Sequence, residues 1–311
     1  MRCLVPGYEE QLQVYRAACL YSLCSSSLLV LNKVVVGYFP VPCFVLLLQL
    51  VSSSLVVLVL RLARVVDFDL SKDTKIKLYY YSLVSSSFVL GVYSSFRALQ
   101  LVNVETIIVC RACTPLWVAV IEALFLNREY PCRRSLFALL MIALGAVWYV
   151  NSDLHFSSSG YFWVSVWFCF LVFGFTYVKH VCDVVTMTTW EQVFLTNSIG
   201  SVPLAVVFYG SGESLALRHC TWNYKSIVSL WLSCLLGLGI SQSAYDLRNR
   251  ISATSFDVVG ICCKFGTILL NMLLGLKTAS VSGLTALCMC LLSSYFYKQA
   301  PLRKPGPTSF A

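Results

Sequence analysis

Two basic residues lie deep inside long apolar segments of the sequence. Lys264 stands near the middle of DVVGICCKFGTILLNMLLG, residues 257–275, and Arg111 lies within the apolar segment 103–126. A charge at this depth in a bilayer costs about 3 kcal/mol even on the mildest insertion scales. The cations therefore indicate a wet cavity or an anionic ligand, or else an ion pair inside the bundle. Asp257, on the same helical face as Lys264 and about 10 Å away, is the candidate partner for such a pair.

Two deep cations with few deep carboxylates predict an anionic substrate that carries about two negative charges, such as a diphosphate. No paired carboxylates, Ser/His/Asp set or metal-binding cluster occurs at suitable spacing, so neither an enzyme nor a cofactor or metal site is expected. No Walker motif is present, which argues against ATP hydrolysis. These features predict a secondary carrier of a phosphorylated metabolite.

The composition is that of an integral membrane protein whose partner is the lipid bilayer. Of the 311 residues, 58% are hydrophobic and only 12% are charged, whereas soluble domains are about 25% charged. The net charge of +9 does not indicate nucleic-acid binding, because the basic residues lie mostly in short loops. The first fifteen residues lack an apolar signal-peptide region, so the first apolar segment is expected to remain as a membrane helix.

The chain is expected to form one transmembrane domain, residues 1–311, of the all-α membrane class. Each span needs about 20 apolar residues. Ten segments qualify: 16–37, 41–63, 78–101, 103–126, 133–151, 160–178, 191–210, 226–247, 251–276 and 279–297. A polar loop at 151–160 divides them into two sets of five, 16–151 and 160–298, which must then lie inverted in the membrane. Inverted repeats with a midplane site are a transporter architecture.

Lysine and arginine predict the orientation. With a cytosolic N-terminus, 16 of the 23 basic residues fall on the cytosolic side, 3 on the opposite side and 4 within segments. The positive-inside rule then places both termini in the cytosol.

Several stretches resemble Golgi nucleotide-sugar transporters of the drug/metabolite transporter superfamily, in particular the GDP-mannose transporter branch. The resemblance covers nearly the whole chain and rests on LNKVVVGYFPVP (31–42), FRALQLVNVETIIVCRACTP (96–115), YVKHVCDVVTMTTWEQVFLTN (177–197) and ISATSFDVVGICCKF (251–265). It implies ten helices in two inverted repeats, the drug/metabolite transporter fold.

The family's Phe-Tyr-Asn-Asn motif on helix seven, which contacts guanine, reads Phe194-Leu195-Thr196-Asn197 here. The resemblance implies that Asn197 keeps this role, since an amide offers both donor and acceptor to a base edge. Thr196 replaces the other asparagine, and its hydroxyl can substitute only in part.

The family's Gly-Ala-Leu-Asn-Lys motif on helix nine, which lines the sugar and phosphates, reads Gly260-Ile261-Cys262-Cys263-Lys264. Glycine and lysine stay in register, and the lysine is implied to meet the diphosphate. Ile261 and Cys263 depart from the motif, so mannose, fucose and other sugars stay open.

Three further positions follow from the same resemblance. Ser241 on helix eight falls at a nucleoside contact, and Tyr21 and Phe256 fall where the family has tyrosines near the ligand. Phe256 keeps the ring and loses the hydroxyl. Ordinary helix packing is the alternative for Tyr21 and Phe256.

The resemblance implies an antiporter in the Golgi membrane that exchanges a cytosolic GDP-sugar for lumenal GMP by alternating access; a homodimer is left open. One alternative is a UDP-sugar or triose-phosphate-type translocator. Translocators of that type tend to carry Lys-Arg on helix nine, where Phe265 follows Lys264 here. Another is a non-transporting membrane homologue, against which the two deep cations argue.

Overall fold

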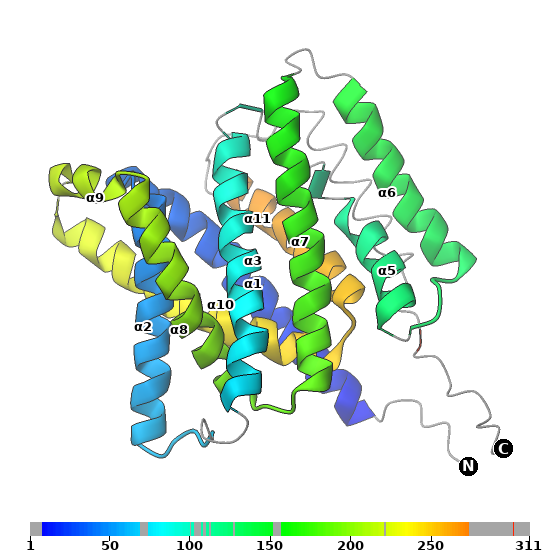
Figure 1. Cartoon of the computed structure of the whole chain (residues 1–311), viewed down its shortest axis with the longest axis horizontal. Helices are drawn as coiled ribbons and strands as arrows, with labels where there is room; N and C mark the ends of the chain where they lie inside the picture. Colours follow the sequence, from blue (N-terminus) through cyan, green and yellow to red (C-terminus); the bar gives the residue numbers. More distant parts are fainter. Residues whose placement is uncertain are drawn as a thin grey trace. The chain divides into compact units, whose positions relative to one another are not determined.

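The computed structural model describes residues 8–68, 74–99, 101–102, 107, 110–111, 113–126, 128–151, 157–220, 222–273 and 301. Within these residues the fold is helical (Figure 1). The helices are α1 (Tyr8–Tyr38), α2 (Pro42–Leu62), α3 (Thr74–Leu99), α5 (Thr114–Phe125), α6 (Arg133–Asn151), α7 (Ser158–Val184), α8 (Thr189–Gly210), α9 (Glu213–Ala216), η1 (Leu217–His219), α10 (Tyr224–Arg250) and α11 (Ala253–Leu273).

The predicted segments overlap these helices over most of their length except for the fourth, described next, and the tenth, 279–297, which lies outside the described residues. The fourth segment, 103–126, is wrong as one continuous helix. A turn at Cys113 precedes α5, which begins at Thr114 with Pro115 in its first turn. Proline is favoured there because it has no N–H to donate, and it cannot continue a preceding helix without loss of a hydrogen bond. The short helices α9 and η1 lie in what the sequence indicated as a loop.

Within the part of the chain that the structure describes, five helices are long and apolar enough to cross a membrane: α1 from Glu9, α2, α7, α8 and α10. Large apolar side chains are exposed along them, among them Val59 and Leu62 on α2 and Val202, Val206 and Tyr209 on α8. An apolar groove between α2 and α8 contains Val202, Val206 and Tyr209. Surfaces of this kind suit lipid and not water or a charged ligand.

The chain divides into two compact units, and each combines segments that are far apart in the sequence. The first unit contains α1, α2, α3 through Tyr93, α8, α9, α10 and α11 from Cys263. The second contains the end of α3, α5, α6, α7 through His180 and α11 through Cys262. This division follows compactness and not symmetry, so the inverted repeats 16–151 and 160–298 stay a prediction.

In the first unit, α1 packs along α10, and α2 packs on α8 and α10. The core at one end of these helices consists of Val35, Phe39, Val41, Val45 and Leu230. The start of α2 is fixed by Glu213, whose carboxylate accepts hydrogen bonds from the backbone N–H groups of Cys43 at 2.9 Å and Phe44 at 3.3 Å. A carboxylate at a helix N-terminus satisfies free donors and complements the helix dipole.

In the second unit, α5 packs on α6, and a core forms from Ala98, Ile107, Val164 and Trp167. The start of α7 approaches the chain after α3 closely. A Cβ on Gly160 would lie 2.5 Å from Val102 Cγ1 and 3.1 Å from the Leu101 carbonyl oxygen. Glycine is required at this position because no side chain fits between the two backbones.

Candidate functional site

The first turns of α3 and α8 are joined by a buried ion pair. Lys77 Nζ lies 2.6 Å from Glu191 Oε1, and both side chains are almost fully buried. Thr188 precedes α8, and its hydroxyl accepts a hydrogen bond from the Glu191 N–H, which caps the helix. The pair sets the position of α3 against α8, since breaking one partner would leave a buried charge unpaired.

Beyond this ion pair, one face of α8 is polar and meets α10. Gln192 and Asn249 exchange two amide hydrogen bonds, of 3.0 and 3.3 Å. One turn further along α8, the Thr196 hydroxyl lies 2.5 Å from the Tyr245 hydroxyl. Ser241 lies one turn beyond Tyr245 on the same face of α10 and is half-buried. The predicted residues Thr196 and Ser241 therefore lie along one interface.

Asn197 differs from its polar neighbours on α8. Its side chain is only 2% exposed, and its Nδ2 has no hydrogen-bond partner among the described residues. A buried NH2 group without a partner costs about 1–3 kcal/mol. Groups of this kind in native proteins require an explanation, such as a ligand or an ordered water.

Tyr21 and Cys263 lie where α1 meets α11 in the first unit. The Cys263 Sγ lies 3.1 Å from the Ser22 hydroxyl, and its carbonyl oxygen accepts a hydrogen bond of 3.0 Å from Ser26. Tyr21 is 8% exposed and is next to Ser22 on α1. The structure thus brings α1 against the helix-nine motif at the residue before Lys264. Lys264 itself lies in α11, but its side chain is outside the described part of the structure.

In the second unit, Arg111 and Phe256 meet at the Phe175 ring. The Arg111 guanidinium carbon lies 5.6 Å from the Phe175 ring centroid, and the Phe175 and Phe256 centroids are 6.0 Å apart. The Arg111 Nε is buried and has no hydrogen-bond partner within the described residues. An arginine that lies over a ring while its Nε donor has no protein partner is suited to bind an anion.

The rest of the helix-nine motif is buried in the same unit. Phe256 is 2% exposed and Ile261 is 5% exposed, and Gly260 is also buried. Asp257, the predicted partner of Lys264, is fully buried in α11. Whether Asp257 and Lys264 pair is not decided, because the lysine side chain is not described.

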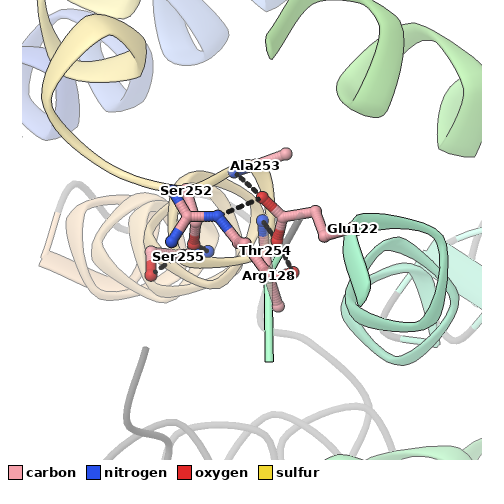
Figure 2. A network of polar contacts seen from close by, with 6 residues as sticks. All are labelled: Glu122, Arg128, Ser252, Ala253, Thr254 and Ser255. Carbon is pink, nitrogen blue, oxygen red and sulfur yellow. Dashed lines mark hydrogen bonds and ion pairs between the residues drawn. The ribbon is translucent and has the colours of Figure 1, made fainter. Parts of the chain in front are cut away.

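A carboxylate on α5 organises the start of α11 (Figure 2). Glu122 is 3% exposed, and its oxygens accept hydrogen bonds from the Ala253 N–H at 2.9 Å and the Thr254 N–H at 3.1 Å. The Thr254 hydroxyl donates to the same carboxylate, and Arg128 Nε lies 3.3 Å from it. Ser252 completes the cap by accepting a hydrogen bond of 3.0 Å from the Ser255 N–H. Glu122 therefore fixes the first turn of the helix that carries Lys264.

Sequence reasoning missed Glu122, Tyr245 and Gln192. A signal for Glu122 was present, because one carboxylate in the apolar run TPLWVAVIEALF needs a partner. Its partners at the start of α11 lie 131 and 132 positions later in the chain, where no local pattern indicates them. No group of residues suited to hold a metal ion occurs among the residues described.

Several known proteins are similar to this chain over most of its length. The GDP-mannose transporter GONST3 of Arabidopsis thaliana is 28% identical over 310 residues, which cover 98% of this chain and 83% of the relative. The GDP-fucose transporter 1 of the same plant is 30% identical over 294 residues, covering 92% and 85%. The UDP-galactose/UDP-glucose transporter 7 of Arabidopsis thaliana is 26% identical over 282 residues, covering 86% and 84%.

A crystal structure of a protein 15% identical in sequence has a TM-score of 0.64 and covers 93% of this chain and 96% of that chain. This likeness concerns the fold alone. A family model described as the Triose-phosphate Transporter family matches residues 13–297. With the spanning helices, this match makes the protein a multi-pass membrane protein, and the expected resemblance to nucleotide-sugar transporters is confirmed. The chain belongs to the Triose-phosphate Transporter family, whose members are transporters and not enzymes.

Proposed function

We propose that the protein is an antiporter that takes a GDP-sugar from the cytosol and returns GMP from the lumen. The observation that carries the proposal is Asn197, a buried amide on α8 whose NH2 group has no partner in the described residues. An amide can donate to and accept from the edge of a guanine at once. The relatives named for GDP-mannose and GDP-fucose support a guanine ligand.

Lys264 is proposed to meet the phosphates of the ligand, and Arg111 stays a second predicted substrate-binding cation. Lys264 lies in the middle of α11, and the Arg111 guanidinium stacks on Phe175 with its Nε unpaired among the described residues. Charge-assisted hydrogen bonds to phosphate oxygens are about twice as strong as neutral ones. A phosphate group therefore compensates a cation that would otherwise be costly in a membrane. Gly260 allows close approach of the ligand to α11, and Ile261 and Cys263 would border the sugar.

Alternating access follows from the charge balance. With the site empty, two deep cations make a closed, dry state unfavourable. With a GDP-sugar or GMP bound, the charge is compensated and the carrier can close and reopen on the other side. The empty carrier therefore changes slowly between its inward-open and outward-open states. Transport then requires the exchange of one ligand for the other.

We place the protein in the Golgi membrane with both termini in the cytosol. The orientation rests on the bias of Lys and Arg toward one side of the predicted spans. Tags at the two termini should become accessible together when only the plasma membrane is permeabilised. Access to one tag without the other would show that the number of spans is odd.

A UDP-sugar is the second candidate ligand. Thr196 stands where the GDP-mannose branch has an asparagine, and its hydroxyl is already engaged by Tyr245. The relative named for UDP-galactose and UDP-glucose is 26% identical, against 28% and 30% for those named for GDP-mannose and GDP-fucose.

The test is exchange in proteoliposomes preloaded with GMP or UMP. We expect GMP-loaded vesicles to take up GDP-mannose or GDP-fucose faster than any UDP-sugar, and unloaded vesicles to take up little of either. Faster uptake of UDP-galactose into UMP-loaded vesicles would overturn the guanine assignment and support the second candidate.

A further inference from the structure

Two side chains on α3 resemble Asn197, because each is buried and has a polar atom without a hydrogen-bond partner among the described residues. Tyr81 and Ser85 are each 1% exposed, and neither the Tyr81 hydroxyl nor the Ser85 hydroxyl has a hydrogen-bond partner among the described residues. They are one helical turn apart, so they lie on one face of α3. Lys77 lies one turn before Tyr81 on that face, where it pairs with Glu191.

This face of α3 runs alongside α8. The Lys77–Glu191 pair joins the helices at their first turns, at 2.6 Å. Further along, the Ser85 hydroxyl lies 3.8 Å from the position that a Cβ on Gly200 would take. The two contacts are separated by eight residues on α3 and nine on α8, which is about 12 and about 13 Å of helix. The two helices therefore run in the same direction, and the lengths of α3 and α8 between the two contacts are similar.

Tyr81 and Asn197 both fall between these two contacts. Tyr81 is midway between Lys77 and Ser85, and Asn197 is one turn before Gly200. Tyr245 of α10 contacts α8 at Thr196, the residue directly before Asn197. The unpaired hydroxyls of α3 and the unpaired amide of α8 thus belong to one buried region of the first unit.

We propose that Tyr81 and Ser85 bind the base of the transported nucleotide together with Asn197, and so help to select it. This inference rests on the proposed function. Two hydroxyls and an amide offer donors and acceptors without net charge, which suits the edge of a purine and not a phosphate. Of the cations near this face, Lys77 is engaged by Glu191, and Arg248 of α10 lies over the Tyr245 ring, 5.9 Å from its centroid.

The test compares Tyr81→Phe, Ser85→Ala and the double variant with wild type in detergent. Two matched controls lie on the same helix at exposed positions: Tyr79→Phe, where the side chain is 64% exposed, and Ser86→Ala. The readouts are the melting temperature without ligand and the GMP concentration that gives half of the maximal thermal stabilisation.

Each single variant should raise the half-saturating GMP concentration about fivefold to tenfold, and the double variant more. The melting temperature without ligand should stay the same or rise, because an unpaired buried hydroxyl is removed. Both controls should behave as wild type.

Unchanged GMP response in the double variant, with wild type responding normally, overturns the inference and leaves the proposed function intact. A lower melting temperature with unchanged GMP response also overturns it, since the hydroxyls would then be paired structurally. Failure of wild type to respond to GMP and to take up a GDP-sugar overturns both the inference and the proposed function.

Discussion

Glu122 and Asn197 are both buried polar side chains in apolar helices, but their surroundings differ. The Glu122 carboxylate accepts two backbone N–H groups and one hydroxyl and is paired with Arg128. Asn197 shares a buried region with Tyr81 and Ser85, and in each of these three residues one polar atom lacks a partner among the described residues. The polar atoms of the Glu122 carboxylate are thus paired within the protein, whereas three polar atoms of the Asn197 region are not paired within the described residues.

We infer that this difference separates the part that holds the fold from the part proposed to bind the ligand. A satisfied carboxylate at a helix N-terminus stabilises, because the free donors of the first turn and the helix dipole are both compensated. Unsatisfied buried groups destabilise, by about 1–3 kcal/mol each. Native proteins keep such groups where a ligand supplies the missing hydrogen bond. An unsatisfied buried polar group therefore indicates a functional site.

The largest effect is expected at Lys264, on the binding side of this comparison. Lys264→Ala should abolish nucleotide-sugar exchange while the protein still inserts and purifies, because only the charge that meets the phosphates is lost. Lys264→Arg should retain little exchange activity, because a planar guanidinium does not replace a compact ammonium group in a site whose shape fits lysine. Uptake and the melting temperature of each purified variant measure this.

The alternative is that Lys264 pairs with Asp257. In that case Lys264→Ala leaves a buried carboxylate unpaired and destabilises the fold. The double variant Lys264→Ala/Asp257→Ala would then recover both stability and transport. Recovery of transport in this variant would show that the lysine does not bind phosphate.

Glu122→Ala should lower the free energy of unfolding by about 3–5 kcal/mol. It leaves the buried Arg128 without this carboxylate and the first turn of α11 uncapped. The control is Glu129→Ala, because Glu129 is exposed. Thermal unfolding of the two variants checks this. Equal stability would show that Glu122 does not hold α11.

Gln192→Met and Asn197→Leu form a matched pair on α8. Gln192→Met removes two hydrogen bonds to Asn249 at similar side-chain volume, so it should cost about 1–2 kcal/mol. Asn197→Leu removes an amide whose NH2 group has no partner in the described structure, so stability should not fall. Both are measured by thermal unfolding without nucleotide. If Asn197→Leu costs as much as Gln192→Met, the comparison fails.

Hydropathy alone predicted most of the helices, because every span must satisfy its backbone internally and present apolar side chains to lipid. The break before α5 was visible in Pro115 but was overridden by the apolar run around it. The backbone partners of Glu122 could not be predicted, since Ala253 and Thr254 lie at a helix start far along the chain.

The candidate site was predictable only in part. Asn197 and Gly260 were identified through motifs, and the free Nδ2 of Asn197 adds a physical reason for its role. Tyr81 and Ser85 carry no motif. Their importance comes from burial without partners, which depends on how α3 and α8 lie together and not on local sequence.

The most direct test of the account is the response of Asn197→Leu to GMP. Wild type with GMP at about one hundred times its dissociation constant should gain about 2.7 kcal/mol of stability. We predict that Asn197→Leu, as stable as wild type without nucleotide, loses most of this gain, while the exposed-site variant Ser86→Ala keeps it. An Asn197→Leu protein that gains as much from GMP as wild type would contradict the claim that the unpaired amide serves the ligand.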